Sequence, residues 1–325
     1  MLRRGRKGPR TRIFFATDVH GSEQCFRKWL NAARVYEVDV LILGGDVAGK
    51  VVVPLVAGAD GTWRGEIHGQ AVAARSEEDL HALQKQIRTM GRYDVVLAPE
   101  EKQALDTEPE RLEELFRGVM LESLERWIAL ADERLPELGV PAFMMLGNDD
   151  FPELADVIRG SQAVENAEDA VFELPGGYEL LSNGYSTPTP WHTPREVSEE
   201  ELDAQLRAAA SGLREPEWAV FNVHCPPVDT HLDQAPKLDD ELRPVVDAGG
   251  LQLVPVGSTA VRALIEEVQS VVGLHGHVHE SPAVQSLGRT LCLNPGSEYG
   301  DGILRGAIVE LDRERGVRRW QLTHG

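Results

Sequence analysis

The sequence has 325 residues, of which 42% are hydrophobic and 26% charged, a composition typical of an ordinary globular protein with one large domain or two small ones. Its formal net charge of −20 at pH 7 disfavours broad electrostatic binding to nucleic acid or to an anionic membrane, since both require positive charge. A small phosphorylated substrate is still compatible with this charge, because a bound metal can invert the local field.

Three cysteines, Cys25, Cys225 and Cys292, lie far apart and form no C-x-x-C pair. We therefore expect neither a disulfide scaffold nor a zinc knuckle, and we predict a reducing, cytoplasmic location. No apolar run approaches the length of a membrane crossing. Residues 1–11 are basic but lack the apolar segment of a signal peptide, so we expect a disordered leader, with RNA contact as the alternative.

The first two predicted strands both end at a carboxylate. Residues 12–17 are typical of a buried strand and lead to Asp18 and His20, and a helix is expected over 22–35. The second strand, residues 38–43, leads to Gly44, Gly45 and Asp46. Because ligand sites in α/β sheets lie at the carboxyl ends of strands, these two ends predict a common site.

The stretch from about 50 to 138 has a different character. Residues 51–56 and 62–67 flank a Gly-Ala-Asp-Gly turn and predict a β-hairpin, and two charged helices are expected over 76–90 and 108–134. We interpret this insertion as a cap over the carboxyl end of the second strand rather than as a second domain. Pairing with a second subunit, which would give a homo-oligomer, is the alternative.

Three further predicted strands end at polar side chains. These strands and their ends are 141–146 before Gly147-Asn148-Asp149-Asp150, 219–223 before His224, and 271–274 before Gly276-His277-Val278-His279. Gly276 has no Cβ, so we expect it to let the backbone turn sharply and present the two histidines at the strand end. The tail, residues 290–297, 306–312 and 317–322, predicts a β-meander.

Five strand ends therefore offer metal-binding side chains. A mixture of imidazole, carboxylate and amide oxygen suits manganese, iron, zinc, nickel or cobalt. Seven ligands are too many for one ion with an open position, but they suit two divalent ions that share a carboxylate. The seven candidates are Asp18, His20, Asp46, Asn148, His224, His277 and His279.

The order D-x-H, G-D, G-N-x-[DE], H and G-H-x-H resembles the calcineurin-like metallophosphoesterases, and residues 294–297 resemble the closing segment of their small prokaryotic branch. The resemblance implies one domain over 12–325, an α/β fold built as a four-layer α/β/β/α sandwich of two mixed β-sheets with flanking helices. It also implies a binuclear metal centre at one edge of the sheets. By their positions in the motif, Asp18, His20 and His279 would bind the first metal. Asn148, His224 and His277 would bind the second, and Asp46 would bridge the two.

The same resemblance implies a hydrolase that acts on small phosphate esters, with phosphodiesters favoured over monoesters. A metal-bridging hydroxide would attack phosphorus in line, and both metals and Asn148 would stabilise the transition state. A metal-binding scaffold of the same fold with little or no catalysis is the main alternative, although all seven ligands are kept. A metal-dependent amide or ester hydrolase on an unrelated fold is a third possibility, disfavoured by the strand order.

Asp149 departs from the family pattern, which usually has a histidine there as proton donor or transition-state stabiliser. An aspartate has a pKa near ~3.9, and two nearby cations would lower it further. We therefore expect an ionised Asp149 that orients His20 or His224, or binds metal weakly. Leaving groups that need little protonation, such as aryl groups, should then be favoured. Asp150 is expected to brace the site.

Several other residues are weaker candidates. His275 is expected to pack in the interior, and Cys225 is expected to be a buried structural thiol. His192, in a proline-rich loop, is a candidate to face the substrate or to supply the missing proton.

Overall fold

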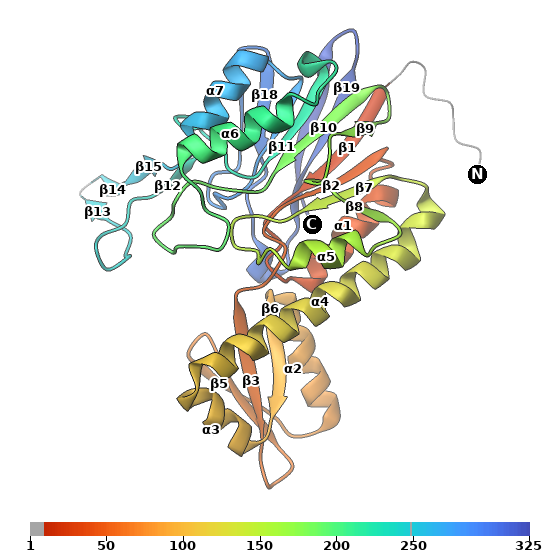
Figure 1. Cartoon of the computed structure of the whole chain (residues 1–325). Coiled ribbons are helices and arrows are strands. Elements are labelled where there is room, and N and C mark those ends of the chain that lie inside the picture. The colour runs from red at the N-terminus through yellow and green to blue at the C-terminus, as the bar shows by residue number, and fades with distance from the viewer. Residues whose placement is uncertain (1–9, 248) are drawn as a thin grey trace.

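Two six-stranded sheets form the centre of the molecule (Figure 1). The computed structural model describes residues 10–247 and 249–325, so most of the expected leader lies outside the described residues. In the first sheet four adjacent strands run parallel, and an antiparallel hairpin is added at one edge, with its inner strand antiparallel to its neighbour. Its order is β20 (Gly316–His324), β19 (Arg305–Asp312), β1 (Arg10–Ala16), β2 (Val40–Gly44), β7 (Ala142–Met145) and β8 (Val164–Asn166).

The second sheet also has four parallel strands at its centre, with an antiparallel strand at each edge. Its order is β17 (Ala283–Leu287), β18 (Thr290–Asn294), β16 (Val272–Leu274), β11 (Ala219–Val223), β10 (Tyr178–Asn183) and β9 (Phe172–Leu174).

The expected β-meander at the tail is wrong, although its three strands exist. β18 belongs to the second sheet, whereas β19 and β20 form a hairpin in the first. The alternation of apolar residues predicts a strand but carries no information about which of two stacked sheets the strand joins.

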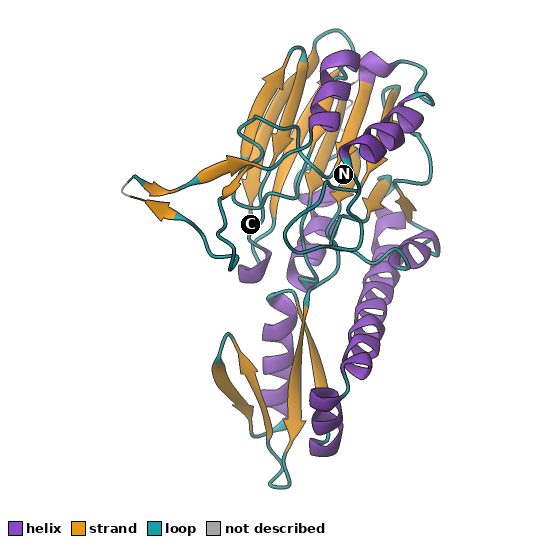
Figure 2. Cartoon of the chain, turned by 60° about the vertical axis from the view of Figure 1, so that its left-hand side comes forward, coloured by secondary structure: helices purple, strands orange, loops and turns teal. Residues whose placement is uncertain are grey.

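Helices cover the outer face of each sheet, which confirms the four-layer α/β/β/α sandwich (Figure 2). In β1, Phe14 packs toward the first helical layer, while Ile13 and Phe15 pack between the sheets, as the period of two in a strand requires. The helices are α1 (Glu23–Val35), α4 (Pro109–Leu138) and α5 (Leu154–Arg159) on the first sheet, and α6 (Glu199–Ala210) and α7 (Thr259–Val268) on the second.

The insertion forms a small sheet of its own at the bottom of Figure 1. The predicted hairpin of β3 and β4 is confirmed, but β5, β6 and α3 were not predicted. Val53, Leu55 and Ile87 are buried in a separate small core. The elements are β3 (Val51–Ala57), β4 (Trp63–Ile67), β5 (Gln70–Ala74), α2 (Glu77–Thr89), β6 (Arg92–Leu97) and α3 (Pro99–Thr107).

A second projection, the β-arm, leaves the sandwich between β11 and α7 (Figure 2). Two short antiparallel pairs build it, and none of its strands was predicted. They are β12 (Gln234–Pro236), β13 (Val246–Asp247), β14 (Gly250–Leu251) and β15 (Leu253–Pro255). Two 3₁₀ helices complete the elements, Pro216–Trp218 and Tyr299–Asp301. Across the described residues, no helix combines the length and apolar character that a membrane crossing requires.

Candidate metal centre

The centre lies where five parallel strands end. β1, β2 and β7 are neighbours in the first sheet, β11 and β16 are neighbours in the second, and the two sheets stack with these ends at the same edge. The loops that follow the strands bring all seven predicted ligands together. Five of the seven are buried, whereas His277 and His279 are partly exposed.

Four ligands form the first group, with ligand atoms that all lie within 4.8 Å of one another: Asp18, His20, Asp46 and His279. The Nε2 atoms of His20 and His279 face each other at 3.0 Å. The distance from His279 Nε2 to Asp18 Oδ1 is 3.2 Å, and that from His20 Nε2 to Asp46 Oδ2 is 3.5 Å. Converging imidazole and carboxylate atoms of this kind fit a borderline divalent cation.

The second group consists of Asn148, His224 and His277. Asn148 Oδ1 lies 3.1 Å from His224 Nε2 and 2.7 Å from His277 Nδ1. Asp46 Oδ2, which belongs to the first group, is also 3.4 Å from His224 Nε2. Asp46 thus contacts both groups, and His277 and His279 lie in different ones.

His224 is fixed by its second ring nitrogen. Its Nδ1 lies 2.9 Å from Gly44 O, which directs Nε2 toward the centre, as carbonyl partners commonly do for metal-binding histidines. His20 differs, because its buried Nδ1 has no hydrogen-bond partner among the described residues. Asp149 Oδ2 is 4.0 Å from this nitrogen, too far for the expected orienting hydrogen bond.

The protonation states of the metal-free centre are mixed. Burial lowers the pKa of His20 to about 3, so its ring is neutral. Burial also opposes the charged form of His224, but Asp46 and Asp18 outweigh it and raise the pKa of His224 to about 10. For Asp18, burial raises the pKa, but a hydrogen bond from His279 and the charges of His224 and His279 together outweigh it, and the pKa falls to about 2. A cation at His224 Nε2 would therefore replace a proton.

The backbone of the centre is strained. Asp18, His20, Asp46 and His277 have φ angles of 53°, 38°, 49° and 67°, in the left-handed region that non-glycine residues rarely adopt. Such strain concentrates at functional sites, where the surrounding structure imposes it.

The sharp turn of the histidine segment is therefore made by His277 and not, as expected, by Gly276. Gly276 is required for a different reason, because a Cβ there would lie 2.3 Å from both Asp18 Oδ2 and Thr17 Oγ1. The glycine lets the histidine turn approach the loop after β1.

Asp150 braces two of the loops, as predicted. Its buried carboxylate accepts hydrogen bonds from the backbone N–H groups of Val47 at 2.9 Å, Ala48 at 2.8 Å and Gly147 at 2.7 Å. It therefore ties the loop after β2 to the loop after β7. Burial and the charge of Asp46 raise the pKa of Asp150 to about 7, against the lowering effect of these N–H groups.

Asn294 braces the histidine turn, a role that sequence reasoning missed. Its side-chain amide donates to Val278 O at 2.8 Å and Gly276 O at 3.3 Å, and its oxygen accepts from Gly296 N at 2.8 Å. Only the resemblance of residues 294–297 to the family's closing segment pointed to this position.

Lys50 is the second residue that was missed, and it forms an ion pair with Asp149. Burial would lower the pKa of Lys50, but Asp46 and Asp149 raise it, so the ammonium stays charged. Burial and Asp46 raise the pKa of Asp149 to about 6 in the metal-free protein, with Lys50 acting against this shift. The lowered pKa that we expect for Asp149 depends on two bound cations, so it concerns the metal-loaded protein and stays a prediction.

The weaker candidates are not among the converging ligands. His275 is fully buried, with Nδ1 2.8 Å from Val223 O, which confirms a packing role. Cys225 is free and buried, and burial raises the pKa of its thiol to about 12, as expected of a structural thiol. His192 is exposed and is absent from the lining of the cavity described next.

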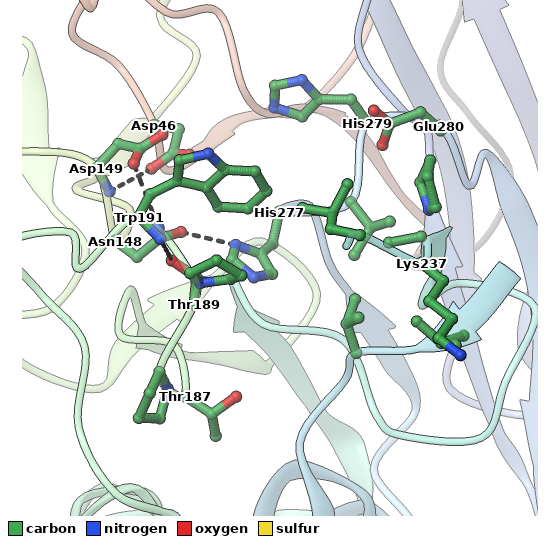
Figure 3. A pocket seen from close by; sticks show the side chains of 18 of the residues that line it. Asp46, Asn148, Asp149, Thr187, Thr189, Trp191, Lys237, His277, His279 and Glu280 are labelled. Atoms are coloured by element: carbon green, nitrogen blue, oxygen red, sulfur yellow. Dashed lines mark hydrogen bonds between the residues drawn. The ribbon is translucent and has the colours of Figure 1, made fainter. Parts of the chain in front are cut away.

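A cavity of about 790 Å³ opens beside the centre (Figure 3). One side is polar, with Asp46, Lys50, Asn148, His277 and His279. The other walls come from the proline-rich loop 187–191 and from the β-arm. The cavity therefore extends well beyond the candidate metal ligands.

Comparison with known proteins supports the fold. No protein-family model matches the chain. Uncharacterized protein MJ1162 of Methanocaldococcus jannaschii is 28% identical over 181 residues, which is 55% of this chain and 71% of that protein. A solved structure superposes with a TM-score of 0.56 at 15% identity, covering 97% of this chain and 98% of the other. The protein TT1561 of Thermus thermophilus superposes with a TM-score of 0.52 at 13% identity, with the same coverage. These structural likenesses are evidence of a common fold.

Proposed function

We propose that this chain, which has the calcineurin-like metallophosphoesterase fold, is a phosphoesterase that uses two divalent metal ions and prefers phosphodiesters. The observation that carries the proposal is the position of Asp46. Its Oδ2 lies 3.5 Å from His20 Nε2 in one ligand group and 3.4 Å from His224 Nε2 in the other, as a bridging carboxylate requires. Asp46 would contact both ions. Asp18, His20 and His279 would complete the first site, and Asn148, His224 and His277 would complete the second.

Two bound ions would activate a water molecule and neutralise charge on the phosphoryl group. The protein contributes geometry, because the strained loops after the strands hold the ligands in place before any ion binds. Lys50 adds a fixed positive charge at the cavity floor, where the ion pair with Asp149 positions its ammonium. This ammonium has three N–H donors, so it can also donate a hydrogen bond to a phosphoryl oxygen as negative charge develops there.

The identity of residue 149 bears on the leaving group. With ions bound, Asp149 is expected to be an ionised partner of Lys50 and hence a poor proton donor. The departing oxygen must then leave without strong acid catalysis. We therefore infer a preference for aryl over alkyl leaving groups, because the conjugate acids of aryl leaving groups are stronger.

The test is a substrate series on protein of measured metal content. We expect about two ions per chain, with turnover of bis(4-nitrophenyl) phosphate that a chelator abolishes and added manganese or zinc restores. Across aryl and alkyl diesters the rate should fall as the pKa of the leaving group rises. A flat dependence would contradict the role given to Asp149. Two tightly bound ions without turnover of any phosphate ester would favour the metal-binding scaffold.

A further inference from the structure

The cavity beside the centre is much larger than a phosphoryl group requires. Its volume of about 790 Å³ falls in the range of about 300–1,000 Å³ that is typical of sites for drug-sized ligands. The candidate ligands and Lys50 lie at one end, and Thr187, Thr189 and Lys237 add polar groups to the other walls. The remaining walls are rich in proline and aliphatic side chains, among them Pro188, Pro190, Leu238, Val254 and Val256.

Trp191 is the one aromatic side chain in the wall formed by the proline-rich loop. It is 64% exposed, an unusual amount for an indole in a free protein. In Figure 3 it lies on the same side of the cavity as Asn148 and Thr189, and Lys237 of the β-arm lies on the other side. The indole and the arm therefore line opposite sides of the cavity, and we call the space between them the slot.

The loop that carries Trp191 is held rigidly. Glu196 Oε1 accepts hydrogen bonds from the hydroxyl of Thr189 and from Thr193, through N at 2.9 Å and Oγ1 at 2.8 Å. Thr193 Oγ1 in turn accepts from Asn148 Nδ2 at 2.9 Å. Prolines on both sides of the tryptophan fix φ and reduce the freedom of the loop further. The backbone that carries the indole is thus held in a defined position relative to Asn148.

From this arrangement we propose that the slot binds an aromatic ring carried by the phosphate ester, and that the ring stacks on the indole of Trp191. The proposal rests on the proposed function, because the phosphoryl group must occupy the centre. A flat ring suits a slot bounded by an indole and aliphatic side chains, since stacking needs no matching polar groups. A nucleobase and a simple aryl group share this chemistry.

Binding of non-hydrolysable ligands separates ring recognition from leaving-group chemistry. Calorimetry on metal-loaded protein compares three phosphonates that have no P–O–C bond: methylphosphonate, phenylphosphonate and 5′-deoxythymidine 5′-phosphonate. We expect each aromatic ligand to bind at least about tenfold more tightly than methylphosphonate, the scale of one stacked ring. Trp191→Ala should reduce this preference to less than about twofold, and Trp191→Phe should keep most of it. Tighter binding of the thymidine ligand than of phenylphosphonate would indicate a nucleobase as the natural ring, and the reverse order would indicate a simple aryl group.

Trp320 supplies the matched control, because it is 49% exposed on β20 and lies outside the cavity lining. Trp320→Ala should retain the wild-type preference. Equal affinity of all three ligands for the wild type, or an unchanged preference in Trp191→Ala, would overturn this inference alone. Absence of binding by every phosphonate, together with absence of diester turnover, would overturn the proposed function and this inference with it.

Discussion

Lys50 occupies a position where family likeness gave no expectation. It lies four residues after Asp46, lines the cavity floor and forms an ion pair with Asp149. We predict that Lys50→Met lowers kcat/KM for a diester by about 10²-fold, the scale of losing one preorganised donor to a developing negative charge. Lys50→Arg should recover most of the activity. Steady-state kinetics on protein with measured metal content checks this, and Lys85→Met, an exposed lysine on α2, is the control.

An unchanged kcat/KM in Lys50→Met at full metal content would contradict the role of Lys50. A loss of activity that follows a loss of metal would assign Lys50 to the stability of the centre instead.

We predict that His224 makes metal binding depend on pH. Its pKa is raised to about 10 because Asp46 and Asp18 outweigh the effect of burial, so in the metal-free protein it is protonated at neutral pH. An ion must displace this proton, and the apparent affinity should therefore rise with pH, by up to about tenfold per unit between pH 7 and 9. Calorimetric titration in buffers of different ionisation enthalpy measures both the affinity and the proton release. Binding that releases no proton and does not vary over this range would count against the prediction.

The convergence of the seven candidate ligands could be predicted because each lies just after an apolar strand, and the carboxyl ends of parallel strands meet at one edge of a sheet. Lys50 and Asn294 could not, because their roles depend on contacts across the fold. Lys50 meets Asp149 through space, and Asn294 reaches the carbonyl oxygens of Gly276 and Val278 from a different strand. The turn expected at Gly276 lies at His277 instead. The sequence alone does not show whether a glycine is needed for a positive φ or for the close approach of another segment.

Among the elements, the loops after β2 and β7 depend on one buried side chain. Asp150 accepts three backbone N–H groups, those of Val47, Ala48 and Gly147. Asp150→Ala would leave these buried donors without a partner, and we expect it to lower the free energy of unfolding by about 3 kcal/mol or more. Chemical denaturation of the metal-free protein measures the change. Asp156→Ala, at an 81% exposed side chain on α5, should cost less than about 0.5 kcal/mol. Equal effects of the two substitutions would show that Asp150 does not brace the loops.

The elements that sequence reasoning missed are those with weak periodicity. β5 is mostly exposed, and α3 has no buried residue, so neither shows the apolar alternation or stripe that marks an element. In the β-arm, Pro236 and Pro255 fall within paired strands, and proline ordinarily argues against a strand. Long buried strands such as β1 and β2 were predictable because burial on both faces leaves a continuous apolar run.

At the scale of the whole molecule, two stacked sheets place five strand ends at one edge, and the insertion and the β-arm project beyond it. The β-arm lines the cavity directly. Lys50, just before β3, also lines it, but no residue of 51–138 does. The covering role expected of the insertion is therefore still a prediction. The specificity of the site is expected to lie in the arm and in the proline-rich loop.

The central claim is that two ions bind in two ligand groups that share Asp46. Anomalous diffraction from crystals of the manganese- or zinc-loaded protein tests it most directly. We predict two peaks, one contacted by His279 and the other by His277, with Asp46 contacting both. A single peak, or one ion bound by both His277 and His279, would contradict the account.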